Sequence, residues 1–504
     1  MSLVHNVKIP PFTDNMLATK SAPKTKVEKP AEEEKPKPSR KRKASDEPVA
    51  APAKKAKVIP KGPVINHAPT QKLHVFVFGE GSSGELGLGT AKNAVDVKRP
   101  RLNPNLLVEN VGVVQIAVGG MHVAALTHDN KIMTWGVNDQ GALGRDTTWD
   151  GGLKDMDAAE KEDSDSDDEE DSGLNPHEST PAAIPADKFP EDTVFTYLAA
   201  SDSATFAVTD DGQVWGWGTF RGNEGILGFT EKVSVQREPM LMPGLKKITK
   251  IACGANHCLA LDANGAVFAW GTGEQNQLGR RIVERSKIQG LIPREFGLPR
   301  KAIKDVACGS YHSFAIDNQD RVWGWGLNNF GETGIQEGVG EDDAAILKPA
   351  VVDALSKKNI VSIEGGSHHS IAAFENGDCV TWGRVDGKQI GLPVSKIPEA
   401  DAFKDDNGAV RIVINPTKVA IPEPVANVTA GPEHNIVITK EGHAYSWGFS
   451  ANYQTALGTE DDVEEPTHIN NTAVKDKQLT KAFAGGQFGV IVASADQPLT
   501  NGSA

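Results

Sequence analysis

Five histidines recur in one setting along the chain, and histidine is the side chain best suited to move protons or bind metals near neutral pH. Each ends a run of small residues, in Gly119-Gly-Met-His122, Gly254-Ala-Asn-His257, Gly309-Ser-Tyr-His312, Gly365-Gly-Ser-His368 and Gly431-Pro-Glu-His434. Weaker copies are Ser201-Asp-Ser-Ala204 and Gly485-Gly-Gln-Phe488. A catalytic or metal-binding histidine occupies one special place, whereas these stand at the same point of a repeat. We therefore interpret most of them as structural.

Other patterns that could carry chemistry do not hold up. Gly79-Glu-Gly-Ser-Ser-Gly84 fits the dinucleotide fingerprint, but Glu-Leu-Gly-Leu-Gly follows it. That segment cannot begin the helix whose N-terminus would meet a pyrophosphate. The chain also contains no phosphate-binding Gly-Lys-Ser/Thr loop, nucleophile elbow or paired-carboxylate motif. We expect no covalent chemistry and no cofactor.

The four cysteines lie in or beside strand-like segments, at Cys253, Cys258, Cys308 and Cys379. None forms a Cys-x-x-Cys pair, so unpaired buried thiols in a reducing compartment are expected and zinc is not. The chain has no apolar run of about 18 residues and no apolar leader at its start, which predicts neither a membrane span nor a signal peptide.

The elements that position these residues are repeated hairpins. The most informative copy is Val214-Trp-Gly-Trp-Gly-Thr-Phe-Arg-Gly-Asn-Glu-Gly-Ile-Leu-Gly228, in which a short apolar strand ends at glycine and returns through Leu-Gly. Glycine supplies the backbone angles that such turns require. Related copies begin at Phe78-Gly79, Trp135-Gly136, Trp270-Gly271, Trp325-Gly326, Trp382-Gly383 and Trp447-Gly448.

A four-stranded unit of roughly fifty residues, present seven times, predicts an all-β chain folded as a seven-bladed β-propeller. We expect the propeller to span residues 73–494 and a short tail to follow at residues 495–504. A propeller must join its ends, because an open edge strand leaves unpaired backbone groups. Val75–Phe78 is therefore predicted to share one blade with strands from 482–493.

Residues 1–72 differ in composition and are predicted to be a disordered basic tail. They hold 16 Lys and Arg against 7 Asp and Glu, which is a net charge of +9. The remainder of the chain therefore carries −23, since the formal net charge of the whole chain is −14. Two basic clusters stand ten residues apart, and they comprise Arg40, Lys41, Arg42 and Lys43, then Lys54, Lys55 and Lys57. Their spacing is typical of a bipartite nuclear localisation signal, and such charge can also neutralise DNA phosphates. The alternative is a solvated basic tail that carries no localisation signal.

An acidic loop is expected within the propeller at residues 155–172. Asp155 to Asp171 holds 11 acidic residues opposed only by Lys161. Ser164 and Ser166 lie among these carboxylates, where an acidophilic kinase could act, but a loop that only tolerates insertion explains the segment equally well.

A basic connection, Arg280-Arg-Ile-Val-Glu-Arg285-Ser-Lys287, follows the fourth hairpin on an otherwise acidic body. A polyanionic partner would explain this charge, and a solvated loop would explain it as well. We treat Arg281, Arg285 and Lys287 as candidate contacts to a nucleosome.

The Trp-Gly…Leu-Gly and Gly-Gly-x-His units resemble the regulator of chromosome condensation family from about His74 to Ala493. Two stretches resemble most closely its Ran-directed members, in a fungal-like form with an acidic insert. They are Gly120-Met-His122 with Gly136-Val-Asn-Asp-Gln-Gly-Ala-Leu-Gly-Arg-Asp146, and Trp217-Gly-Thr-Phe-Arg-Gly-Asn-Glu-Gly-Ile-Leu-Gly228. In that family the second stretch is an extended loop called the β-wedge.

The resemblance implies a guanine-nucleotide exchange factor for the nuclear GTPase Ran, acting at chromatin in nucleocytoplasmic transport and mitosis. The wedge would supply Phe220, Arg221, Gly222, Asn223, Glu224 and Gly225. One propeller face would supply Asp202, Asn256 and His368, with Arg280 and Asn329 around them. Asn256 and Ser82 stand where the family motif has an acid, and Phe488 stands where it has a histidine.

The partners implied are Ran, DNA with histones, and an importin that binds the tail, for a monomeric nuclear protein. A different class of function is a chromatin-bound or ubiquitin-pathway scaffold that uses the propeller only for binding. The wedge distinguishes the two, because a scaffold has no need for one elongated Phe-Arg-x-Asn loop in a single repeat.

Overall fold

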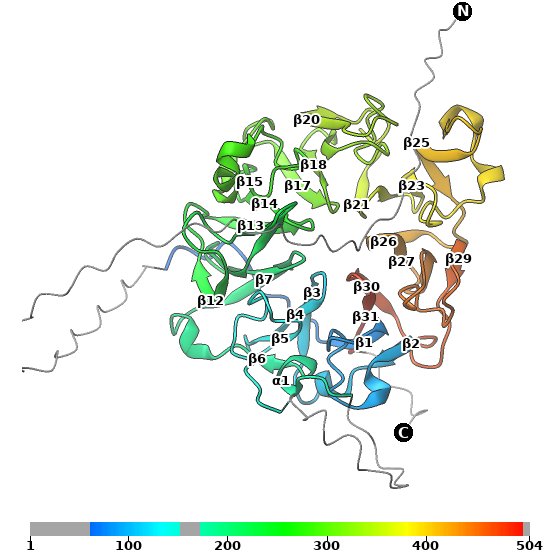
Figure 1. The fold of residues 1–504 in the computed structure, drawn as a ribbon. Coiled ribbons are helices and arrows are strands. Elements are labelled where there is room, and N and C mark those ends of the chain that lie inside the picture. The colour runs from blue at the N-terminus through cyan, green and yellow to red at the C-terminus, as the bar shows by residue number, and fades with distance from the viewer. Residues whose placement is uncertain (1–60, 152–171, 497–504) are drawn as a thin grey trace, which may run out of the picture. The chain divides into compact units, whose positions relative to one another are not determined.

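Seven large antiparallel sheets stand as blades around a central channel (Figure 1). The computed structural model describes residues 61–151 and 172–496. Within them, six sheets have four strands, one has five, and a separate two-stranded hairpin projects from one blade. This arrangement confirms the predicted all-β, seven-bladed β-propeller.

The strands are given blade by blade, from the channel outward. Blade 1 has β30 (Leu479–Ala484), β31 (Phe488–Ser494), β1 (Leu73–Glu80) and β2 (Asp96–Leu102). Blade 2 has β3 (Val113–Val118), β4 (His122–Thr127), β5 (Ile132–Gly136) and β6 (Ala182–Ala183). Blade 3 has β7 (Phe195–Ala200), β8 (Ala204–Thr209), β9 (Val214–Gly218) and β12 (Gln236–Leu241), with the hairpin β10 (Phe220–Gly222) and β11 (Gly225–Gly228).

The other four blades repeat the plan. Blade 4 has β13 (Ile248–Cys253), β14 (His257–Asp262), β15 (Val267–Gly271) and β16 (Arg294–Glu295). Blade 5 has β17 (Ile303–Cys308), β18 (His312–Asp317), β19 (Val322–Leu327) and β20 (Ala345–Val351). Blade 6 has β21 (Ile360–Gly365), β22 (His369–Phe374), β23 (Cys379–Arg384), β25 (Val410–Val419) and β24 (Ala402–Lys404). Blade 7 has β26 (Val425–Ala430), β27 (His434–Thr439), β28 (Ala444–Gly448) and β29 (Val463–His468).

Helical structure is minor among the described residues. One short α-helix, α1 (Pro176–Ser179), accompanies the 3-10 helices η1 (Lys92–Ala94), η2 (Pro104–Leu106), η3 (Ala186–Lys188), η4 (Glu284–Leu291), η5 (Val394–Lys396) and η6 (Glu399–Asp401). None of the helices seen in the described ranges has the length and apolar run needed to cross a bilayer.

A buried tryptophan lies at the joint with the preceding blade in six of the seven blades. Six tryptophans at the ends of third strands are fully buried, and five of them donate an indole hydrogen bond of 2.8–3.0 Å to a carbonyl of the preceding blade. Glycine must follow, because at Gly136 φ is +97° and a Cβ would lie 2.4 Å from the Met121 carbonyl oxygen. The Trp-Gly repeat thus encodes the joint between blades.

The repeated histidines lie in the same joints and are fully buried. His122, His257 and His312 each place Nε2 2.7–2.8 Å from a Ser or Thr hydroxyl of the next blade. Burial lowers the pKa of His122 to about 4 and that of His257 to about 3, so both are neutral at physiological pH. These contacts confirm the structural interpretation.

The predicted register of the histidine copy in blade 6 was wrong by one residue. His369, and not His368, is the buried repeat histidine, and its Nε2 lies 3.0 Å from Asn435 Oδ1. The correct unit is therefore Gly366-Ser-His-His369. Two consecutive histidines concealed the register in the sequence.

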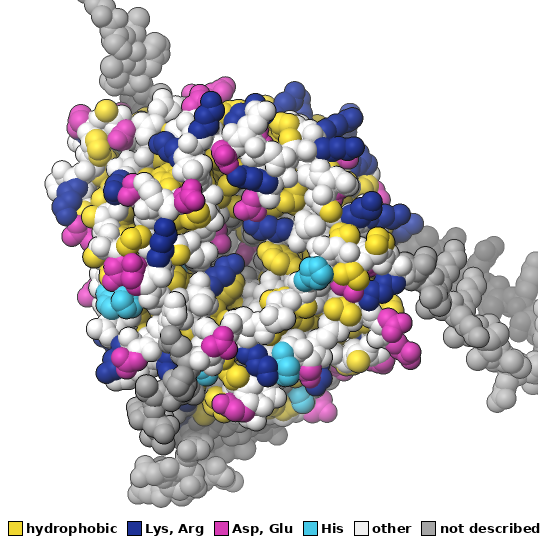
Figure 2. Space-filling view, turned by 180° about the vertical axis from the view of Figure 1, so that it is seen from behind, with side chains coloured by type: hydrophobic (Ala, Val, Ile, Leu, Met, Phe, Trp, Pro, Cys, Tyr) yellow, Lys and Arg dark blue, Asp and Glu magenta, His cyan; other side chains and the backbone are white. Residues whose placement is uncertain are grey.

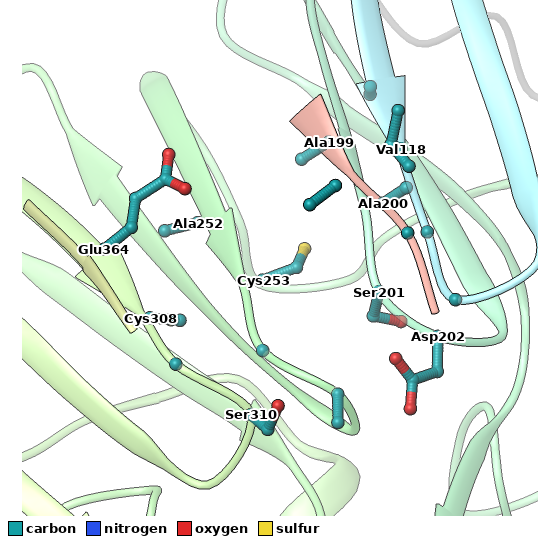
Figure 3. Close-up of a pocket in the computed structure, with 18 of the residues that line it drawn as sticks. Val118, Ala199, Ala200, Ser201, Asp202, Ala252, Cys253, Cys308, Ser310 and Glu364 are labelled. Atoms are coloured by element: carbon teal, nitrogen blue, oxygen red, sulfur yellow. The ribbon is translucent and has the colours of Figure 1, made fainter. Parts of the chain in front are cut away.

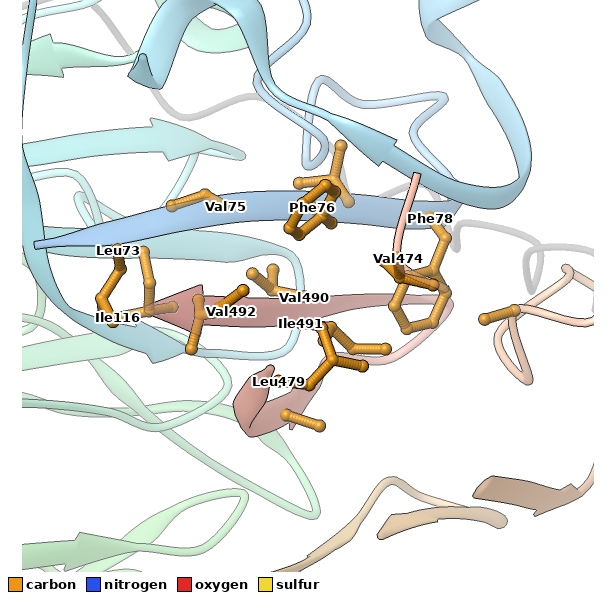
Figure 4. Close-up of a cluster of buried hydrophobic side chains, with 14 of the residues drawn as sticks. Leu73, Val75, Phe76, Phe78, Ile116, Val474, Leu479, Val490, Ile491 and Val492 are labelled. Carbon is orange, nitrogen blue, oxygen red and sulfur yellow. The ribbon is translucent and has the colours of Figure 1, made fainter. Parts of the chain in front are cut away.

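The ring closes as predicted. β1 pairs antiparallel with β31, with Val75 opposite Val492 and Phe78 opposite Gly489, so the first and last described strands share blade 1. Figure 4 shows their buried side chains in one cluster with residues of the neighbouring blades. The chain ends are thus locked by about seven paired residues on each strand.

Part of the predicted tail is ordered. The N–H groups of Ile65 and Asn66 donate to the Asp210 carbonyl, and the Asn66 side chain donates to the carbonyls of Thr209 and Ile248. The prediction of disorder through residue 72 was therefore wrong for residues 62–66, because blades 3 and 4 satisfy polar groups whose partners composition cannot indicate. The basic clusters at residues 40–43 and 54–57, the acidic run at 155–171 and the tail beyond 496 lie outside the described residues.

Candidate functional site

One face of the propeller carries the turns between first and second strands and the loops between third and fourth strands. In every blade a backbone hydrogen bond of 2.8–3.0 Å joins the two connections. The accepting carbonyls belong to Met121, Ser203, Asn256, Tyr311, His368, Glu433 and Gln487, which hold equivalent positions. Asn256 and His368 are therefore on one face, which we call the wedge face, and Asp202 precedes Ser203 on it.

The wedge is the hairpin of residues 220–228 between β9 and β12. Its short strands β10 and β11 pair with each other, with Arg221 opposite Ile226 and Gly222 opposite Gly225. Gly225 has φ of +113°, which explains the glycine at the turn. Leu227-Gly228 here forms part of β11, whereas Leu143-Gly144 of blade 2 lies in a tight turn in which the Gly144 N–H donates to the Gly141 carbonyl.

Phe220 was predicted to be a contact residue of the wedge, and that prediction was wrong. Its side chain is fully buried in a triangle of stacked rings with Phe206 and Phe229, whose centroids lie 6.2 and 6.3 Å from its own and 6.1 Å from each other. Side chains alternate along a strand, so an inward Phe220 turns Arg221 outward. Phe220 anchors the base of the wedge, and Arg221, Asn223 and Glu224 are exposed.

Ile226 is an exposed wedge residue that sequence reasoning did not single out. Its side chain is 49% exposed on β11, opposite Arg221. A large apolar side chain on a projecting hairpin is suited to a partner surface. The signal available in the sequence was a large apolar residue next to Leu227-Gly228 in the one copy whose loop departs from the repeat.

Replacing the tight turn has left a polar group without a partner. The indole Nε1 of Trp270 has no hydrogen-bond acceptor among the described residues, whereas five equivalent tryptophans each donate to the preceding blade. Trp270 instead packs edge-on against Phe206 at 5.5 Å. A buried unsatisfied donor costs roughly 1–3 kcal/mol. The blade therefore tolerates a local loss of stability at the place where the wedge projects.

The central channel opens beside the wedge and encloses about 960 Å³. Asp202, Arg221, Asn223 and Asn256 all line it. Figure 3 shows Asp202 near one end, with Cys253, Cys308 and Glu364 farther along the wall. Although Asp202 touches solvent, the surrounding walls reduce its hydration and raise its pKa from 3.8 to about 6. The charge of Arg221 opposes this rise.

His368 and Asn329 lie together on the neighbouring part of the wedge face. His368 is partly exposed, and its Nδ1 lies 3.1 Å from the buried Glu332 carboxylate. Its ring is 5.0 Å from that of Phe330, which adjoins Asn329 in the next loop. Asn329 accepts a backbone bond from Gly340 through its main chain. Glu332 and Phe330, which the sequence did not mark, orient the histidine.

Arg280 was predicted to lie on the contact face, and that prediction was wrong. Its guanidinium donates at 3.1 Å to the carbonyls of Ala269 and Ile292 within blade 4. Burial lowers the pKa of Arg280 to about 10. Arg145, which follows the same Leu-Gly in blade 2, likewise donates to two backbone carbonyls. Arg280 is thus a repeat-borne structural residue.

The basic connection divides into free and paired charges. Arg281 and Arg285 are exposed, whereas Lys287 lies 2.5 Å from Glu224 at the wedge tip and 2.8 Å from Glu284. These carboxylates raise the pKa of Lys287. Lys287 therefore stays protonated but is engaged in two exposed ion pairs, with which a nucleosome contact would compete. Phe488, which stands where the family motif has a histidine, is fully buried in blade 1, as the repeat histidines of the other blades are.

No group of three or more His, Cys, Asp or Glu side chains within the described ranges is arranged to hold a metal ion. Figure 2 shows the side turned away from the viewer of Figure 1, where Lys, Arg, Asp and Glu side chains are interspersed.

The candidate site consists of a projecting polar hairpin, an apolar exposed isoleucine and a carboxylate beside a channel. Such a surface can insert into a partner and exchange polar contacts with it.

Comparisons with known proteins agree with this architecture. The model of the RCC1-like domain matches residues 74–491. The guanine nucleotide exchange factor SRM1 of Saccharomyces cerevisiae is 44% identical over 428 residues, which cover 83% of this chain and 87% of that protein. The crystal structure of Prp20p from Saccharomyces cerevisiae, described with its binding to Gsp1p and histones, has a TM-score of 0.77 and 40% identity over 86% of this chain and 94% of that chain. Yeast RCC1 (Prp20) bound to Kap60 has a TM-score of 0.78 and 39% identity, covering 90% and 97%.

Proposed function

The chain belongs to the family of the RCC1-like domain, and we propose that it is a guanine-nucleotide exchange factor for the GTPase Ran. The observation that carries this proposal is the wedge. It is a single hairpin that breaks the repeat and presents Arg221, Asn223 and Ile226 outward beside Asp202. A relative that is 44% identical over most of both chains is named as an exchange factor.

The mechanism requires no covalent step. A GTPase holds its nucleotide through backbone N–H groups, a lysine and Mg²⁺ around the phosphates. The wedge enters this phosphate-binding region, where Arg221 and Asn223 make polar contacts and Ile226 packs against the displaced segment. Because an exchange factor must stabilise the nucleotide-free state, these contacts form most fully once the phosphates have left. Asp202, His368 and Asn329 bind the surface around the region and hold the wedge in register.

Release of labelled GDP from Ran tests this function. Substoichiometric protein should accelerate release well above the intrinsic rate in excess unlabelled GDP, because one exchange factor acts on many GTPases. A scaffold would bind and leave the rate unchanged. A release rate equal to that of Ran alone would therefore overturn the proposal.

Chromatin binding belongs to the same proposal. Prp20p is described with binding properties to histones. Residues 40–43 and 54–57 would bind DNA phosphates and serve as the signal bound by an importin, while Arg281 and Arg285 would contact the nucleosome. The protein would act in the nucleus as a monomer. Removing residues 1–60 should weaken DNA binding and flatten its salt dependence, and equal affinity in both proteins would move the contact elsewhere.

A further inference from the structure

We infer that Glu274 is a positioning residue that holds the wedge in its projecting form before any partner binds. This inference rests on the proposed exchange function and deepens it. Glu274 lies in the loop between β15 and β16 of blade 4, whereas the wedge belongs to blade 3. Its carboxylate Oε2 accepts a hydrogen bond from the backbone N–H of Asn223 at 2.7 Å.

The wedge needs such a support because it is very short. β10 has three residues and β11 has four, and they pair only with each other. An isolated two-stranded hairpin is at best marginally stable in water. The buried Phe220 fixes the base but leaves the tip beyond it unsupported. Contacts from outside the hairpin must therefore order residues 221–226.

Two outward N–H groups of the wedge, one in β10 and one in the turn that follows it, meet acceptors in blade 4. The Arg221 N–H donates to Asn256 Oδ1 and the Asn223 N–H donates to Glu274, both at 2.7 Å. Alternate N–H groups of a strand point the same way, so this edge of β10 is bound by side chains in place of a third strand. Asn256 therefore supports the wedge as well, at Arg221, which is two residues nearer the base of the wedge than Asn223.

Gly222 permits the close approach. A Cβ at this position would lie 2.8 Å from Glu274 Oε1, so any larger residue would displace the carboxylate. The φ of Gly222 is not positive, and its requirement for glycine is therefore steric. Gly222 and Glu274 form a matched pair across the boundary between blades 3 and 4.

A second tie, from Lys287 to Glu224, is weaker. The Glu224 side chain is 80% exposed, and solvent-exposed ion pairs contribute little because water screens them and two long side chains must be ordered. Glu274 accepts from the main chain, so its loss frees the backbone of the tip and not only one side chain.

Hydrogen exchange of the free protein and GDP release from Ran test the inference together. Glu274→Ala should increase amide exchange across residues 221–228 at least fivefold and lower the maximal GDP-release rate about tenfold, with the half-saturating concentration changed less than twofold. Glu274→Gln keeps an oxygen that can accept the Asn223 N–H, so it should stay within about twofold in both measurements. Glu295→Gln, which removes an exposed carboxylate of the same blade, is the control.

The outcomes separate the inference from the function. Unchanged amide exchange in Glu274→Ala, with an unaltered melting temperature, would overturn the support whether or not Ran responds. If amide exchange is faster in Glu274→Ala but the wild type does not accelerate GDP release from Ran, Glu274 still supports the wedge and the exchange function is rejected. Should Glu274→Ala fail to fold, Gly222→Ala provides the second variant, and normal amide exchange there would contradict the matched pair.

Discussion

At the scale of single residues, neighbours in the wedge have opposite tasks. Phe220 is buried against two phenylalanines, and Arg221 projects beside the channel. The sequence allowed the wedge to be recognised but did not indicate which side chains point outward, because a three-residue strand offers too little alternation to set its phase. The same limit concealed Ile226. The burial of each side chain, which no sequence motif indicates, distinguishes the residue that anchors the wedge from those that can contact a partner.

Removing the Phe220 ring should mainly affect stability. Phe220→Ala deletes a fully buried ring and is expected to cost about 3–5 kcal/mol of unfolding free energy, as large cavities in cores do. Ile226→Ala, at a 49% exposed position, should change stability by no more than about 0.5 kcal/mol. Denaturant titrations of both variants measure the difference. Equal effects would contradict the assignment of the two side chains.

Removing the Arg221 side chain should affect exchange and not stability. Arg221→Ala alters an exposed residue, so the melting temperature should stay nearly constant. The GDP-release rate should fall about tenfold, which corresponds to ~1.4 kcal/mol of differential stabilisation. Asp202→Ala and His368→Ala should act in the same direction. Release within twofold of wild type for all three folded variants would remove them from the site.

At the scale of elements, the joint between blades is the unit that the sequence encodes best. Trp-Gly at the end of the third strand in six blades and a buried histidine at the start of the second strand in five predicted seven blades correctly, because both recur at the contact between neighbouring blades. The support of the wedge was not predictable in this way. It depends on Glu274 of another blade, about fifty residues away, and local patterns carry no information about such contacts.

Acid should weaken these joints. Five buried histidines have lowered pKa values, about 4 for His122 and His369, about 3 for His257 and His434, and well below 6.5 for His312. The unfolded chain therefore binds more protons below pH 6.5, so stability is complete above that pH and is lost as the pH falls. At pH 5 each of the four histidines with a pKa of about 3 or 4 should lower the free energy of unfolding by about 2 kcal/mol.

Raised pKa values at Asp202, Glu85, Glu178 and Glu364 act in the opposite sense, but fewer groups are involved than the five histidines. Thermal melts between pH 7.5 and 5 should show a steep fall in melting temperature. A variant with His257→Gln should show a shallower fall. A melting temperature that does not change between pH 7.5 and 5 would contradict the prediction that protonation of the buried histidines destabilises the joints.

At the scale of the whole molecule, closure makes the seven blades one cooperative unit. β1 and β2 come from the beginning of the described chain, and β30 and β31 come from its end. The sequence predicted this pairing because an unclosed ring would expose strand edges. It did not predict the ordering of residues 62–66 against blades 3 and 4, where the acceptors are main-chain carbonyls that any sequence would provide.

Deleting residues 480–504 should abolish cooperative folding. The deletion removes β31 and most of β30, and it exposes the edge of β1 together with the apolar cluster of blade 1 (Figure 4). Deleting only residues 497–504, which lie outside the described residues, is the control and should leave the melting transition unchanged. A normal transition in the longer deletion would contradict closure by strand pairing.

The central claim is that the wedge face stabilises Ran without its nucleotide. The affinity of the protein for Ran should therefore be measured once with nucleotide removed and once with excess GDP. A tight complex is expected without nucleotide, GDP should dissociate it, and Arg221→Ala should weaken the nucleotide-free complex more than the loaded one. Since a binder with equal affinity for both states shifts no equilibrium, equal affinities would contradict the account.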